Sequence, residues 1–169
     1  MTDAVCDSGP LTHLWQVGEW RAFSTFQAMY IPNQVAREVV IHVPLSQMSV
    51  QAGLEPIIDD VSEQEIVVVR HKTPGALGLH VADLATLAVA LRRLPELVLT
   101  DDLATRRAIE LQGQTPMGSV GVILRAHKAG MLDLVTLDRV IDNLFTHSTL
   151  YLSPLFKRYV RRLIASLTH

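Results

Sequence analysis

The stretch VADLATLAVALRRLPELVLTDDLATRRA, residues 81–108, indicates a helix, a strand and a second helix in close succession. Its first part has apolar residues at the i, i+3, i+4 and i+7 spacing of one helix face, namely Val81, Leu84, Leu87, Ala88, Leu91 and Leu94. The apolar run at 96–100 then favours a buried strand, and a further helix is expected over 103–112. Helices that alternate with short apolar strands are typical of a parallel sheet covered on both faces.

The rest of the chain continues this alternation. Apolar or β-branched runs predict strands at 4–6, 28–31 and 66–69. Helices are expected at 11–17, 20–26, from an N-cap at Asn33 to about residue 42, and at 120–129, 134–145 and 154–167. Residues 44–65 mix polar loop with a possible short helix. The predicted fold class is α/β, a three-layer α/β/α arrangement with a central, mostly parallel sheet, in a single domain over 1–169.

Composition excludes several classes of protein. With 169 residues, 49% apolar and 19% charged, the chain can bury a sizeable core and is not expected to be disordered. One cysteine, Cys6, cannot form an internal disulfide or a cysteine-rich zinc site, which indicates a reducing compartment. Because no apolar run approaches the roughly 18 residues of a membrane span and no signal-peptide pattern is present, we expect a cytoplasmic protein without a membrane partner.

The net charge of −2 hides a division along the chain. Residues 1–102 contain 6 Lys/Arg and 13 Asp/Glu, whereas residues 103–169 contain 9 Lys/Arg and 4 Asp/Glu. Such asymmetry is a reason to look for a charged ligand. The near-neutral total is therefore compatible with an acidic pocket beside a basic track.

Three acids follow predicted strands. Asp7 comes directly after the strand at 4–6, and Asp101 and Asp102 close the strand at 96–100. In open parallel sheets, ligands bind beyond the carboxyl ends of the strands. The simpler interpretation is that Asp7 caps a turn and that one of the later pair is a helix N-cap.

Two further acids lie on predicted helices. Glu38 shares a helix face with Val35 and Val39, so it is predicted to turn towards the sheet, where a carboxylate needs an ion-pair partner or a metal. Asp83 lies in the first turn of the helix at 81–94, where the helix macrodipole also favours an acid. Clustered carboxylates of this kind suit Mg²⁺ or Mn²⁺, which can promote displacement at phosphorus.

Five segments in this order resemble a PIN domain, a metal-dependent ribonuclease fold. They are VCDSGPL (5–11), YIPNQVAREVV (30–40), VADLATLAVAL (81–91), LVLTDDLATRRA (97–108) and GQTPMGSVGVILRAHKAGML (113–132). The last segment resembles a prokaryotic, toxin-type subgroup of the family. The resemblance extends over nearly the whole chain and is weakest over 44–79.

The resemblance implies a metal-dependent endoribonuclease of the kind found as the toxin of a toxin–antitoxin pair, often a homodimer neutralised by a small antitoxin protein. The implied catalytic residues and ligands of Mg²⁺ or Mn²⁺ are Asp7, Glu38, Asp83 and Asp102, with Asp101 as an accessory ligand or a cap. Ser8 and Thr100 would orient these carboxylates.

Four basic residues near or after the acids are candidates for holding RNA phosphates, namely Arg106, Arg107, Arg125 and Lys128. A solvated helix face explains them equally well. With 5% aromatic residues, base stacking is not supported by composition.

Two other functions stay open. A PIN-like module with little or no activity could bind RNA or a protein partner, and a phosphatase on a related sheet is a remote alternative. The scattered histidines, His13, His42, His71, His80, His127 and His147, are expected at the surface or in packing roles, and Cys6 in the core. The wide apolar face of the helix at 154–167 either supports a dimer or packs on its own domain.

Overall fold

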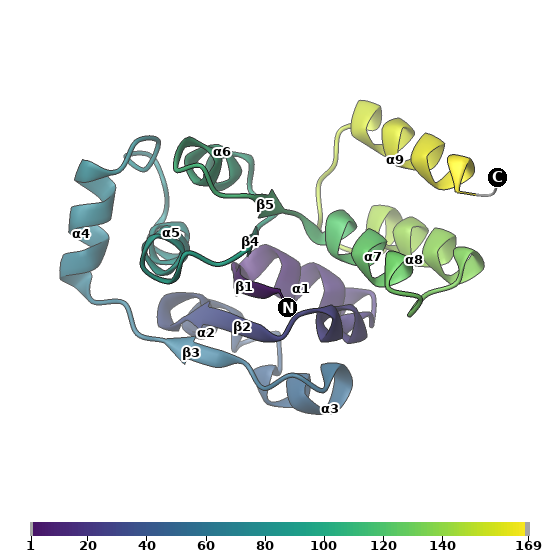
Figure 1. The fold of residues 1–169 in the computed structure, drawn as a ribbon, viewed down its shortest axis with the longest axis horizontal. Helices are drawn as coiled ribbons and strands as arrows, with labels where there is room; N and C mark the ends of the chain where they lie inside the picture. Colours follow the sequence, from purple (N-terminus) through teal and green to yellow (C-terminus); the bar gives the residue numbers. More distant parts are fainter. Residues whose placement is uncertain (1, 168–169) are drawn as a thin grey trace.

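A five-stranded parallel sheet forms the centre of the computed structural model, which describes residues 2–167 (Figure 1). Met1 and residues 168–169 of the predicted domain lie outside the described residues. The strands are β1 (Asp3–Cys6), β2 (Ala28–Pro32), β3 (Ile57–Asp59), β4 (Leu97–Leu99) and β5 (Pro116–Met117). Their order is β3-β2-β1-β4-β5, so the chain turns back at β1 and continues on its other side with β4. That reversal creates a crevice at the carboxyl ends of β1 and β4, where such sheets bind ligands.

Alternating strand residues divide the core into two layers. Ala4 and Cys6 of β1 belong to one apolar cluster, whereas Val5 between them belongs to the other. The first cluster includes residues of α1 (Ser8–Gln16), the 3₁₀ helix η1 (Trp20–Thr25), α2 (Asn33–Val39), α7 (Ser119–Lys128) and α8 (Leu134–Thr146). The second includes residues of α4 (Glu63–Lys72), α5 (Val81–Arg93) and α6 (Leu103–Leu111). The predicted three-layer α/β/α fold is confirmed, with every strand pair parallel.

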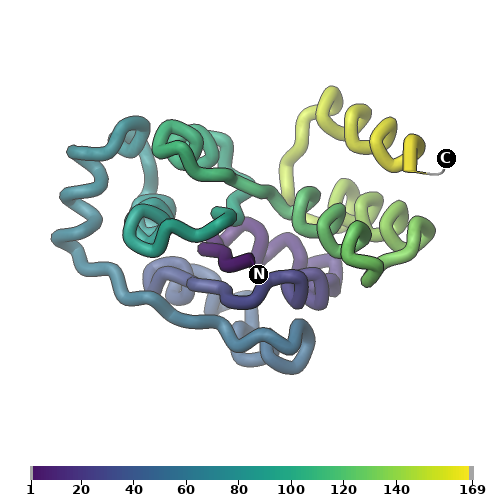
Figure 2. Tube along the Cα trace, in the orientation of Figure 1, coloured from purple at the N-terminus to yellow at the C-terminus, as the bar shows by residue number. Residues whose placement is uncertain are grey.

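The remaining helices lie at the margins. The 3₁₀ helix η2 (Leu45–Gln47) and α3 (Met48–Ala52) connect α2 to β3. The last helix, α9 (Pro154–Ser166), buries Val160 and Ile164 and packs beside α8. In Figure 2 the trace ends at α9, at the opposite end of the molecule from α4. None of the helices within 2–167 is long and apolar enough to cross a membrane.

The strand predicted at 66–69 is wrong, because these residues lie within α4. Ser62 and Glu65 form a capping box, in which the Ser62 hydroxyl accepts a hydrogen bond from the Glu65 N–H and the Glu65 carboxylate accepts one from the Ser62 N–H. Ile66 and Val69 are buried, whereas Val67 and Val68 face solvent. The cap and tertiary packing therefore outweigh the β-propensity of the run.

Other differences concern element boundaries. The helix predicted from Asn33 to 42 ends at Val39, and the Asn33 side chain accepts a hydrogen bond from the Val61 N–H instead of capping. The short strands β3 and β5 were not predicted. The first helix starts at Ser8 and not at 11, since Asp7 caps it.

Candidate active site

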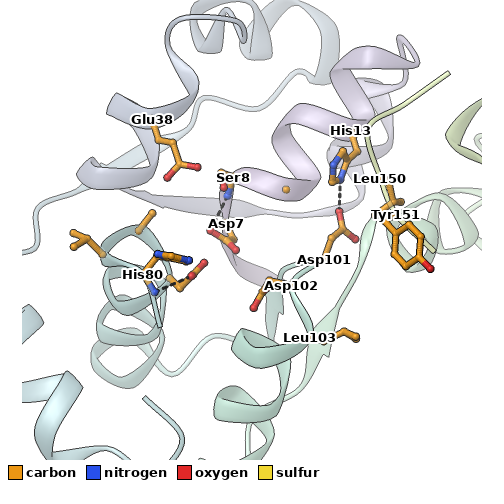
Figure 3. Close-up of a pocket in the computed structure, with 14 residues that line it drawn as sticks. Asp7, Ser8, His13, Glu38, His80, Asp101, Asp102, Leu103, Leu150 and Tyr151 are labelled. Atoms are coloured by element: carbon orange, nitrogen blue, oxygen red, sulfur yellow. Dashed lines mark hydrogen bonds and ion pairs between the residues drawn. The ribbon is translucent and has the colours of Figure 1, made fainter. Parts of the chain in front are cut away.

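A cavity of about 700 Å³ lies at the carboxyl ends of β1 and β4 (Figure 3). All five acids predicted from the sequence line it, namely Asp7, Glu38, Asp83, Asp101 and Asp102. The other lining residues include Ser8, His13, His80, Leu103 and Tyr151. The strand reversal at β1 thus brings together carboxylates that are up to 95 residues apart in the chain.

Asp7 is the most enclosed of these acids. It follows β1, is 2% exposed, and its N–H donates a hydrogen bond of 2.9 Å to the Leu99 carbonyl of β4. Its Oδ1 accepts from the Ser8 N–H at 2.8 Å, and its Oδ2 accepts from the Thr100 hydroxyl at 2.9 Å. The Thr86 hydroxyl of α5 lies 3.4 Å from Oδ1. Asp7 therefore has a fixed orientation, with Ser8 acting through its backbone and Thr100 through its side chain.

This setting disfavours the ionised form of Asp7. Burial, followed by the charges of Asp83 and, more weakly, Glu38, raises the pKa of Asp7 from 3.8 to about 7, against the lowering effect of the Ser8 and Thr100 hydrogen bonds. Burial and the nearby charge of Asp102 likewise raise the pKa of Asp83. The cavity is a place where added positive charge would be stabilised.

Asp83 and Glu38 approach the cavity from two helices. The Asp83 carboxylate accepts a hydrogen bond of 3.2 Å from the His80 N–H, so it also caps the start of α5. Glu38 was predicted on the buried face of its helix, but it is exposed at the cavity margin. Val35 and Val39 are the buried residues of α2, and Figure 3 shows the Glu38 carboxylate turned towards Asp7.

Asp101 and Asp102, the adjacent acids after β4, accept hydrogen bonds from the first turns of two different helices. Asp102 caps α6, because its Oδ1 accepts hydrogen bonds from the Thr105 N–H at 2.7 Å and the Thr105 hydroxyl at 2.9 Å. Asp101 points the other way, where its Oδ1 accepts from the Ser119 N–H at 2.7 Å and its Oδ2 lies 2.7 Å from Nδ1 of His13. Each acid thus has a capping role in addition to its place in the cavity wall.

The four residues predicted to bind phosphate lie in different parts of the structure. Arg106 is half-buried, with Nη1 3.5 Å from the Thr100 carbonyl, and Arg107 is exposed on the same helix. Arg125 instead donates a hydrogen bond of 2.8 Å to the hydroxyl of Thr2, which precedes β1 at the opposite end of the sheet. Lys128 is nine residues beyond Ser119 on α7, or about 14 Å along the axis. None of the four lines the cavity, and of the four only Arg106 contacts a residue beside it, the Thr100 carbonyl.

A family model described as a PIN domain matches residues 3–166. The chain belongs to the PIN domain family. PIN domains are generally nucleases, and they typically use divalent metal ions. No curated protein and no solved structure matches the chain at a significant level.

The donor chemistry of this PIN domain fits a hard divalent cation. Carboxylate oxygens are the ligands that Mg²⁺ and Mn²⁺ prefer. Within residues 2–167 no three His, Cys, Asp or Glu side chains lie close enough together to form a ready-made metal site. Mg²⁺ usually keeps several water molecules and takes only one or two carboxylates, so a cavity edged by acids suits it better than a closed cage.

Three residues in or beside the candidate site were not among the site residues predicted from the sequence. His13 was expected at the surface or in a packing role, yet it lines the cavity and contacts Asp101. Ser119 and Thr86 are fully buried polar residues that contact Asp101 and Asp7. Their partners are 18 to 88 residues away in the chain, so no local periodicity could identify them.

Proposed function

We propose that this PIN domain is a metal-dependent endoribonuclease that hydrolyses RNA phosphodiester bonds in the acidic cavity. The observation that carries the proposal is the placement of Asp7, a buried and oriented carboxylate with a raised pKa that borders an open cavity with four other acids. Buried acids with strongly shifted pKa values in a cleft are characteristic of functional sites.

Mg²⁺ or Mn²⁺ is the proposed cofactor, with Asp7, Glu38, Asp83 and Asp102 as the acids around it, one or two of them bound directly and the others through waters that the ion retains. When bound, such an ion supplies an activated water and offsets the charge on the phosphate. Asp101 is proposed as an accessory residue and not as one of these ligands, because its carboxylate is turned towards Ser119 and forms a close pair with His13.

The protein's own residues prepare the site. Thr100, Thr86 and the Ser8 N–H keep the Asp7 carboxylate in one orientation, which reduces the reorganisation needed when charge develops on the substrate. Arg106 and Arg107 are proposed to hold phosphates on the strand beyond the scissile bond.

A toxin role, with RNA as substrate and an antitoxin as partner, follows from the resemblance and is proposed with the activity. Dimerisation is supported by the apolar side chains that α9 leaves exposed, including Leu155 and Tyr159 at 71% and 60%. The expected location is cytoplasmic. Light scattering tests the oligomeric state, and co-expression with short neighbouring reading frames tests for an antitoxin.

The decisive assay incubates a panel of single-stranded and structured RNAs with purified protein and Mn²⁺ or Mg²⁺. Asp7→Asn should abolish cleavage, whereas Asp3→Asn, at the other end of the same strand, should leave it unchanged. No cleavage by the wild type together with flat metal-binding calorimetry would reject the proposal.

One observation favours the alternative, a module that binds RNA without turnover. Asp83 and Asp102 both cap helices, and the described residues form no ready-made metal trio. This alternative predicts RNA binding of equal affinity in the wild type and Asp7→Asn, with no metal-dependent cleavage in either protein.

A further inference from the structure

His13 and Asp101 meet in the wall of the acidic cavity, although they are 88 residues apart (Figure 3). His13 projects from α1, and its Nδ1 lies 2.7 Å from Oδ2 of Asp101. Because a carboxylate accepts hydrogen bonds, the short contact assigns a proton to Nδ1. The proposed metal ligands and phosphate-binding residues leave this pair without a role.

Asp101 is itself held firmly. Its Oδ1 accepts from the Ser119 N–H at 2.7 Å, and its Oδ2 accepts from the Ser119 hydroxyl at 2.5 Å. A Cβ atom at Gly118 would lie only 2.8 Å from Oδ1, and one at Gly9 would lie 3.2 Å from the Asp101 Cβ. Two glycines and a helix cap therefore enclose the carboxylate, which fixes the imidazole ring through Nδ1.

The other ring nitrogen of His13 is left for a ligand. Within the described part of the chain, Nε2 of His13 makes no hydrogen bond. It is also not one of the fully buried polar atoms, so a ligand can reach it. His13 also lines the same cavity as Asp7 and Tyr151. The His13 ring is therefore fixed through Nδ1, has a second nitrogen without a partner in the described protein, and belongs to a side chain that lines the acidic cavity.

We propose that His13 contacts the substrate, donating to or accepting from the sugar–phosphate backbone of the bound RNA through Nε2, with Asp101 as its positioning residue. The inference rests on the proposed ribonuclease function. The contacted group is either a phosphate oxygen or a ribose 2′-hydroxyl, since both can hydrogen-bond an imidazole nitrogen.

Two substitutions test the roles of the two ring nitrogens of His13 separately. The amide of His13→Asn lies near the position of Nδ1 and can keep the Asp101 contact, whereas the amide of His13→Gln reaches the position of Nε2. Affinity for a labelled single-stranded RNA is measured in an Asp7→Asn background, so that cleavage does not consume the ligand. His71→Asn, on the exposed surface of α4, is the matched control.

The proposal predicts that His13→Asn weakens RNA binding about three- to tenfold, the range for one lost hydrogen bond, and that His13→Gln weakens it less. Thermal stability should follow the opposite order, because only His13→Asn keeps the contact with Asp101. An RNA affinity of His13→Asn equal to that of His71→Asn, or RNA affinities that follow thermal stability, would overturn the proposal.

Asp101→Asn tests the positioning role. It keeps an acceptor for the Ser119 N–H but places an NH₂ group against His13. We expect a loss of RNA affinity similar to that of His13→Asn, and no further loss in the double variant, because coupled residues are not additive. Full additivity would contradict a shared role.

The RNA itself distinguishes the two contacted groups. If a single 2′-deoxy substitution at one position removes the difference between the wild type and His13→Asn, the hydroxyl is the partner. If the difference persists at every position, the phosphate is the partner. If the protein cleaves RNA but His13→Asn leaves the RNA affinity unchanged, this inference alone is rejected. If RNA binding depends on His13 but the protein cleaves no RNA, only the ribonuclease proposal is rejected. No RNA binding or cleavage at all rejects both.

Discussion

The hydroxyl of Thr100 donates a hydrogen bond of 2.9 Å to Oδ2 of Asp7, and both residues are buried where β1 and β4 end. The carboxylate that directly follows one central strand is thus held by the residue that directly follows the neighbouring strand. The hydrogen bond favours the ionised form of Asp7, while burial and the neighbouring acids oppose it.

The stability of the metal-free protein should depend on the protonation of Asp7. Its pKa is about 7 in the folded state and near 3.8 when unfolded, so the folded state retains a proton that the unfolded state has lost. Stability should therefore fall as pH rises from about 4 to about 8, by up to about 4 kcal/mol in total, with no further change from this group above that range.

Urea unfolding at pH 5 and pH 8 measures this effect. Between pH 5 and pH 8, the free energy of unfolding of the wild type should fall by about 3 kcal/mol more than that of Asp7→Asn. Asp3→Asn should behave as the wild type does. If the stability of the wild type and of Asp7→Asn depended equally on pH, the pKa of Asp7 would not be raised in the folded protein.

Thr100→Val removes the hydroxyl and keeps the side-chain shape. At pH 8, where Asp7 is mostly ionised, the loss should cost about 1.5–3 kcal/mol of unfolding free energy, the range for a hydrogen bond to a charged group. At pH 5 the cost should be smaller, since the protonated acid needs the donor less. The exposed residue Thr115 provides the control, Thr115→Val. A cost that is independent of pH would indicate packing alone.

The helical state of α4 can be tested at neighbouring valines. Val67 is 56% exposed and Val69 is 8% exposed. Val67→Lys should change stability by no more than about 0.5 kcal/mol, whereas Val69→Lys should destabilise the fold by several kcal/mol in urea unfolding. A buried strand at 66–69 would make both substitutions severe.

Much of this fold could be predicted from the sequence. The periodicity of 81–94 identifies α5, and the apolar runs before Asp7 and Asp101 identify the central strands. The strand-end acids then followed from the general rule that parallel sheets bind ligands at their carboxyl ends.

The errors have physical causes. The run at 66–69 has high β-propensity, but its state depends on the Ser62 cap and on packing against α5. β5 has two residues and β3 exposes two of its three, so neither carries a hydrophobic pattern. The contact between His13 and Asp101 depends entirely on the assembled fold, which explains why local spacing gave no signal for it.

The most direct measurement of the central claim is anomalous diffraction from crystals soaked in Mn²⁺. We predict a peak in the cavity about 2.0–2.3 Å from carboxylate oxygens of Asp7 and at least one of Glu38, Asp83 and Asp102, absent from crystals of Asp7→Asn. A cavity without a peak in crystals of a protein that cleaves RNA, or a peak that persists unchanged in Asp7→Asn, would contradict the account.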